Sequence, residues 1–125
     1  MTTQEVAEKV IALVRTGNYA AAHEQFYSPE IVSIEAEGAP APTVKGLEAI
    51  AKKGEEFNNM MDAFHSIEVS DPLVAENFFS CTMKMVVTPK GAPGPVNMDE
   101  IAVFEVREGK IVKEQFFYTP EPQTA

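Results

Sequence analysis

Apolar residues near the start of the chain recur every three or four positions, which is the period of an amphipathic helix. Thr2 and Glu5 have the spacing of a capping box that begins such a helix, and Gly17 is placed to end it. A second, short and alanine-rich helix is predicted for residues 19–26, before Pro29 interrupts the pattern. The residues that mark the first helical stripe are Val6, Val10, Leu13 and Val14.

A third helix is predicted from a single apolar stripe that begins at Leu47 and ends near Met61. Between the second and third helices, residues 31–36 have the composition of a strand. Residues 37–45 contain two prolines, so we expect a surface loop without regular structure there.

The second half of the chain alternates between apolar and polar residues, as strands do. The connection at residues 89–95 is rich in proline and glycine, and residues 119–125 are predicted to form a frayed tail. Helices followed by hairpin-connected strands predict an α+β fold, with the helices on one face of a curved, mostly antiparallel sheet. The four predicted strands are residues 65–70, 78–88, 96–106 and 110–118.

The hairpin formed by the last two strands brings two acidic residues onto one otherwise apolar face. We predict a three-residue loop at residues 107–109, whose glycine can adopt a positive φ. In that register Ala102 faces Glu114 and Glu100 faces Phe116, so both carboxylates point to the same side of the sheet. A two-residue loop would change the pairing by one position and turn Glu114 outward.

The opposite face of the same strands also carries large apolar side chains, which a sheet face in contact with water should not hold. We therefore expect this outer face to be the interface of a homodimer. The residues concerned are Val86, Ile101, Val103 and Phe117.

The composition limits the possible partners and locations. The 125 residues suit a single domain, and a hydrophobic content of 45% argues against disorder. A net charge of -9 without a basic run makes nucleic acid and anionic membranes poor partners. We find no signal-peptide pattern and no membrane-length apolar run, so we expect a cytoplasmic protein. Cys81, the single cysteine, excludes an intrachain disulfide and is expected to be a buried apolar residue.

Several local strings, together with the order of elements, resemble the nuclear transport factor 2-like superfamily and, within it, the SnoaL-like and ketosteroid isomerase-like domains. The strings are YSPEIVSIEA at 27–36, GLEAI at 46–50, MDEIAVF at 98–104 and GKIVKEQFFY at 109–118. The resemblance covers nearly all of residues 1–125. It implies a cone-shaped, mixed and mostly antiparallel sheet wrapped around three N-terminal helices, the cystatin-like or SnoaL-like α+β barrel.

The resemblance also suggests one catalytic residue and shows that two other catalytic positions of the family lack the required side chains here. Ketosteroid isomerases use an aspartate at the end of the first strand as a proton-shuttling base, and Glu35 stands at that position. Their two oxyanion donors, a tyrosine and a protonated aspartic acid, correspond to Val10 and Ala102. Because both donors are absent, we do not expect steroid isomerisation by that mechanism.

Three carboxylates, those of Glu35, Glu100 and Glu114, are expected to converge in an otherwise apolar pocket that takes a small hydrophobic ligand. Repulsion and lost hydration would keep at least one of them protonated near neutral pH. This suits cofactor-free isomerase, cyclase or hydratase chemistry on a carbonyl compound, with Glu35 as base and Glu100 or Glu114 as acid. The same acids also suit a solvated or structural role, which leaves a non-catalytic ligand-binding or dimerisation module as the alternative.

His65 is a further candidate acid or base, although its apolar neighbours along the strand favour a neutral histidine in the core. No His-x-x-x-His motif or other local ligand pattern occurs, so neither a metal nor a cofactor is expected. The expected ligand-binding residues are Phe57, Met61, Met83, Met98, Phe104, Phe116 and Tyr118.

Overall fold

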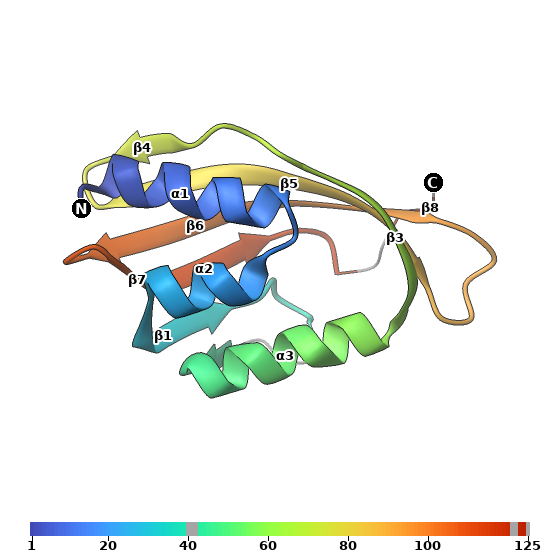
Figure 1. Cartoon of the computed structure of the whole chain (residues 1–125). Helices are drawn as coiled ribbons and strands as arrows, with labels where there is room; N and C mark the ends of the chain where they lie inside the picture. The colour runs from blue at the N-terminus through green and yellow to red at the C-terminus, as the bar shows by residue number, and fades with distance from the viewer. Residues whose placement is uncertain (40–42, 121–122, 125) are drawn as a thin grey trace.

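A computed structural model describes residues 1–39, 43–120 and 123–124 of the chain. Three helices, α1 (Thr3–Arg15), α2 (Tyr19–Phe26) and α3 (Leu47–Asn59), lie on one side of a curved sheet (Figure 1). The strands are β1 (Tyr27–Ile34), β2 (Thr43–Lys45), β3 (Met61–Val69), β4 (Leu73–Ala75), β5 (Phe78–Pro89), β6 (Val96–Arg107), β7 (Lys110–Phe117) and β8 (Gln123–Thr124).

The sheet follows the order β2-β1-β7-β6-β5-β3, while β4 pairs with β5 and β8 pairs with β6. Every pairing is antiparallel except that of β1 with β7, which is parallel. Because β2 and β3 end the path without pairing with each other in the described part of the chain, the sheet is curved but not closed. The expected mixed α+β fold with N-terminal helices and a mostly antiparallel sheet is confirmed.

Helix α1 is fixed at both of its ends. The predicted capping box is present, because the Glu5 backbone N–H donates to Thr2 Oγ1 and the Thr2 N–H donates to Glu5 Oε1. In the last turn, the Arg15 guanidinium donates to the Val69 carbonyl and to Asp71. The buried face of α1 therefore packs in one orientation on the sheet; it consists of Val6, Ala7, Val10, Ile11 and Val14.

The core lies between the helices and the concave face of the sheet. Phe79 on β5 and Phe104 on β6 are register partners, and their rings stack with centroids 4.6 Å apart. Cys81 is buried beside them, as expected. Alternate residues of β5 and β6 thus form a continuous apolar layer under α1.

The loop between β6 and β7 has two residues, so the predicted three-residue loop is wrong. Arg107 pairs with Lys110, and the two residues between them, Glu108 and Gly109, have φ angles of 51° and 76°. Two successive positive φ angles define a type I′ turn, whose twist suits a hairpin.

A β-bulge in β7 then restores the side-chain phase that the shorter loop would have reversed. Val106 pairs with Ile111 but Glu105 pairs with Lys113, so Val112 is the extra residue. Beyond the bulge Glu114 lies opposite Phe104, two positions from its predicted partner. A shift of two leaves each side chain on the same face, so the predicted register is wrong but Glu114 points inward as expected.

Other boundaries differ from the predictions. β1 already begins at Tyr27, and part of the expected loop at 37–45 is strand β2, although residues 40–42 lie outside the described residues. β3 begins at Met61 rather than His65, and β4 was not predicted. Within the expected tail, β8 pairs with Val96 and Asn97; residues 121, 122 and 125 are not described. None of the described helices has the length and hydropathy needed to cross a membrane.

The hairpin turn gives a first test, with a second glycine as its matched control. Gly109→Ala should lower the free energy of unfolding by roughly 1–2 kcal/mol, because an alanine is strained at a φ of 76°. Gly54→Ala, in the interior of α3 with no atom within 4 Å of the added Cβ, should raise it by up to about 1 kcal/mol. Urea denaturation measures both; equal effects would contradict the type I′ assignment.

Candidate functional site

Glu114 is the buried centre of a polar cluster on the concave face of the sheet. Parallel pairing places Ser33 of β1 beside it, and Phe104 of β6 lies on its other side. The side chain is 4% exposed, and its two oxygens accept hydrogen bonds from the Tyr27 hydroxyl and, at 2.6 Å, from Ser33 Oγ. Two donors inside the protein replace the water that this carboxylate has lost.

Lys53 extends from α3 into the same cluster. Its Nζ donates to Ser33 Oγ at 2.7 Å and lies 3.8 Å from Glu35 Oε2. It also lies 5.5 Å from the centroid of the Phe116 ring, within the range of a cation–π contact. The ammonium therefore stands between the buried Ser33 and the more accessible Glu35.

Glu35 follows the last residue of β1 and is partly buried. Its Oε2 atom is shielded from solvent and accepts no hydrogen bond from any residue that the structure describes. Burial raises the pKa of this carboxyl group and the charge of Glu114 adds to the rise, whereas Lys53 and the Tyr118 hydroxyl lower it.

Glu100 lies on β6, opposite Met83 of β5. Burial raises its pKa to about 7, the charges of Glu35 and Glu114 contribute to the rise, and Lys53 opposes it. Close to neutral pH, Glu100 is therefore divided between its acid and carboxylate forms, which is the state that a proton donor or acceptor needs.

The same carboxylates affect the pKa of two tyrosines. Burial and the charges of Glu35 and Glu100 raise the pKa of Tyr118 to about 12. Burial and the charge of Glu100 also raise the pKa of Tyr19 at the start of α2. Both hydroxyls consequently stay protonated at neutral pH and can donate hydrogen bonds.

The structure thus brings Glu35, Glu100 and Glu114 close enough for their charges to affect one another, as the sequence predicted. The surroundings are not otherwise apolar, because Lys53, Ser33 and two tyrosines share the site. The three acids also differ: Glu114 has two hydroxyl donors, Glu35 has the ammonium, and Glu100 has no hydrogen bond with the described residues.

Sequence reasoning missed four residues of the site: Lys53, Ser33, Tyr27 and Tyr19. Lys53 lies three positions after Ile50 and four before Phe57, so it shares the apolar stripe of α3, and this spacing could have indicated it. Ser33 and Tyr27 have the same parity along the chain as Glu35 and Ile31, but no pattern in the sequence predicts the parallel pairing that brings them to Glu114.

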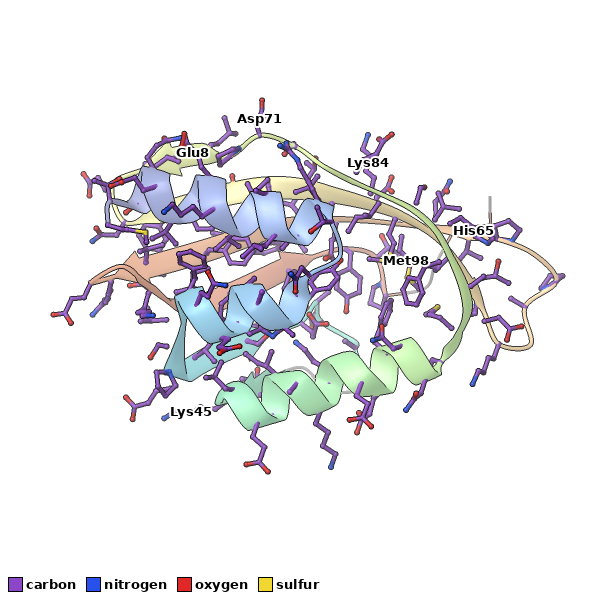
Figure 2. All side chains as sticks on the ribbon, viewed as in Figure 1. Glu8, Lys45, His65, Asp71, Lys84 and Met98 are labelled. Carbon is purple, nitrogen blue, oxygen red and sulfur yellow. The ribbon has the colours of Figure 1, made fainter. Side chains whose placement is uncertain are left out.

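His65 does not join the cluster. It is exposed on β3, with Nε2 2.7 Å from Thr88 Oγ1, near the end of the sheet at which β3 begins (Figure 2). The expectation of a histidine in the core is wrong because a register irregularity leaves His65 unpaired between Phe64 and Ser66 and breaks the alternation with Ile67.

The expected ligand-binding residues divide into two groups. Met61, Met83 and Phe104 are buried in the core. Phe57, Met98, Phe116 and Tyr118 are only partly buried, and Figure 2 shows Met98 on the helix side of the sheet. The second group could therefore contact a molecule that reaches Glu35 or Glu100 without displacing the core.

An enclosed cavity at the carboxylates stays a prediction. Two open hollows among the described residues lie around the β6–β7 turn, and neither is lined by Glu35, Glu100 or Glu114. Within residues 1–39, 43–120 and 123–124, no group of three histidine, cysteine, aspartate or glutamate side chains is arranged to hold a metal ion.

The open curved sheet with three helices on its concave side is the fold of nuclear transport factor 2-like proteins. The family model of the SnoaL-like domain matches residues 1–118, and the chain belongs to this family. None of the curated proteins matches its sequence.

Solved structures agree with this assignment. A proposed SnoaL-like polyketide cyclase from Mesorhizobium loti is 33% identical, with a TM-score of 0.88 over 94% of this chain and 100% of that one. An NTF2-like protein from Burkholderia thailandensis is 17% identical, with a TM-score of 0.83 over 96% and 92%. A proposed hydroxylase from Streptomyces galilaeus is 15% identical, with a TM-score of 0.71 over 96% and 90%. The last two likenesses concern the fold alone.

The raised pKa of Glu100 predicts how stability depends on pH. The folded protein holds this proton with a pKa of about 7 against an ordinary value of 4.5, so the free energy of unfolding should fall as pH rises from 4.5 to 7. In Glu100→Gln the fall should be smaller by up to about 3 kcal/mol, with Glu35 supplying part of what remains. Urea denaturation at several pH values tests this, and parallel curves for the two proteins would contradict it.

Proposed function

We propose that this protein catalyses cofactor-free acid–base chemistry on a small organic carbonyl compound. The observation that carries the proposal is the Glu35 carboxylate, whose solvent-shielded Oε2 accepts no hydrogen bond from the described residues and lies 3.8 Å from the Lys53 ammonium. In an enolisation, a base can remove the proton from the α-carbon while a neighbouring cation stabilises the negative charge that develops on the carbonyl oxygen. Glu100 beside them supplies a group that carries a proton near neutral pH.

In this proposal Glu35 removes a proton from the carbon next to the carbonyl group. The electron pair of the broken C–H bond moves to form the enolate, and the negative charge develops on the carbonyl oxygen. Lys53 stabilises that oxygen, and so replaces the two donors whose positions are held by Val10 and Ala102. The proton then returns to a different atom, which gives isomerisation, or the enolate attacks a second carbonyl, which gives cyclisation.

Glu100 is assigned the role of acid in place of Glu114. Glu114 is 4% exposed and its two oxygens already accept hydrogen bonds, so it has no direct route to a ligand. Glu100 is free of such bonds with the described residues, and its charge contributes to the raised pKa of two tyrosines, whose hydroxyls can donate to an oxygen atom of a ligand. A proton on Glu100 can pass to an alkoxide or to a leaving hydroxyl.

The relative from Mesorhizobium loti supports the choice of reaction class. Its name gives a proposed polyketide cyclase, with carbohydrate phosphatase beside it, and aldol-type cyclisation begins with the same enolisation. The partly buried Phe57, Phe116 and Tyr118 suit a ligand with an apolar body.

A second candidate is a non-catalytic module that binds a hydrophobic ligand. The apolar Val10 and Ala102 at the positions of the two oxyanion donors favour it. Native mass spectrometry of the protein purified from its host would separate the candidates, because a retained small molecule in the absence of any turnover supports binding alone.

The catalytic proposal predicts the effect of Glu35→Gln. Exchange of α-protons for deuterium in a panel of cyclic enones and β-keto esters, followed by NMR, reports enolisation without knowledge of the natural substrate. The variant should lose roughly 100-fold or more of the exchange rate, which is the usual contribution of a general base. Glu37→Gln, two residues along the chain and exposed, is the control and should keep the parent rate. Equal rates for the parent and Glu35→Gln would exclude Glu35 as the base.

We also propose a homodimer through the outer sheet face. Ile101 and Phe117 are neighbours across β6 and β7 and are each 49% exposed. Lysines and acids face each other across the strands around them, so this face is nearly neutral in a chain of net charge -9 and two copies would not repel there. The charged pairs are Lys84 with Asp99 and Lys113 with Glu105.

Phe117→Glu should convert the dimer to a monomer, because each copy would bury an unpaired carboxylate in the interface. Sedimentation velocity at tens of micromolar measures the change. Met60→Glu adds the same charge at an exposed apolar residue at the end of α3 and should leave the dimer intact. A monomeric parent at that concentration would refute the proposed interface.

A further inference from the structure

The Lys53 ammonium stands at the end of a chain of hydrogen bonds that begins at a buried carboxylate. Ser33 Oγ, fully shielded from solvent, receives the Lys53 Nζ–H at 2.7 Å and gives its own proton to Glu114 Oε2 at 2.6 Å. The other Glu114 oxygen accepts from Tyr27. Only one direction is possible for these bonds, because an ammonium group has no acceptor and a carboxylate has no donor.

Helix α3 by itself places Lys53 only loosely. Its first turn is tied to β1 by the hydrogen bond from the Gly46 N–H to the Ile31 carbonyl, but no side chain caps the helix. Ile50 is its one buried residue among those described, and Gly54 weakens the helix interior directly after Lys53. A lysine side chain has four rotatable carbon bonds, so packing alone leaves its ammonium mobile.

We infer that Glu114 is a positioning residue, which orients the Ser33 hydroxyl so that Ser33 holds the Lys53 ammonium beside Glu35. With the Glu114 carboxylate present, the Ser33 hydroxyl donates its proton to Glu114, so a lone pair of the Ser33 oxygen faces Lys53. Without it, the hydroxyl can rotate away from Lys53, and among the described residues the ammonium keeps the ion pair with Glu35 at 3.8 Å and the contact with the Phe116 ring. The inference rests on the proposed role of Lys53, but the position of the ammonium can be measured without turnover.

The first measurement is the rate at which the Lys53 ammonium protons exchange with water, followed by ¹⁵N-detected lysine NMR at low temperature. In the parent protein this exchange should be slow compared with that of Lys52, which is exposed on the same helix. Ser33→Ala should accelerate it roughly tenfold or more, as expected for the loss of a hydrogen bond to a charged group. Ser33→Cys, which keeps a side chain of similar shape with a weaker acceptor, should give an intermediate rate.

The second measurement separates an effect through Ser33 from a direct effect. Glu114→Gln should accelerate Lys53 exchange in the parent background and have little further effect in Ser33→Ala, because one path carries the coupling. Glu35→Gln, which leaves Ser33 and Glu114 in place, should change the rate less than Ser33→Ala does. Backbone amide spectra control for unfolding, and Ser33→Cys keeps the test available if Ser33→Ala does not fold.

Two results would overturn the inference: unchanged Lys53 exchange in both Ser33→Ala and Glu114→Gln, or acceleration by Glu35→Gln alone. Where the deuterium-exchange assay gives turnover, Ser33→Ala and Glu114→Gln should lower kcat more than they change KM, since Lys53 acts on the developing oxyanion. If that assay gives no turnover, the proposed reaction fails while the NMR result still decides the position of Lys53.

Discussion

A carboxylate with 4% of its surface exposed must find its hydrogen-bond donors inside the protein, and Glu114 finds both of them on β1. Tyr27 comes from the start of β1 and Ser33 from its end, so both ends of the strand must lie in register with β7. Lys53 then joins α3 to the same point through Ser33. The parallel strand pair and the helix beside it are thus fixed around one buried charge.

How Glu114 comes to face inward shows what alternation in a sequence can and cannot predict. The pattern of β6 and β7 predicted the correct face, because burial of the apolar phase decides it. The loop length was wrong, and the error was cancelled by the bulge at Val112, which has no distinctive residue type. The hydrophobic effect, summed over many residues, decides which face of a strand is buried. The pairing register depends on the backbone dihedral angles of one or two residues, and the alternation of apolar and polar residues does not predict these.

The same distinction explains the site residues. Glu35 was found by resemblance at a strand end and Glu100 by its place in an alternating strand. The helical spacing could have placed Lys53 on the inner face of α3, but it could not show that Ser33 on β1 would accept its hydrogen bond. His65 was misplaced because the irregularity that leaves it unpaired moves it off the buried phase. Contacts between distant elements, here 20 residues apart for Lys53 and Ser33 and 81 for Ser33 and Glu114, leave no periodic signal.

In water the three glutamates would have the same protonation behaviour. In the structure they differ, because each has different hydrogen-bond donors and charged neighbours. Glu114 has two hydroxyls and is committed to holding the cluster together. The Lys53 ammonium lies 3.8 Å from Glu35, which favours the ionised form of Glu35 and leaves its shielded Oε2 without a hydrogen bond from the described residues. Glu100 has burial and two like charges but no donor from the described residues, so the proton settles there. A ligand that brings a hydrogen-bond donor or a charge to this site would therefore change the protonation of Glu100 before that of the other two acids. Because its protonation depends on the ligand, Glu100 is the acid best placed to exchange a proton with it.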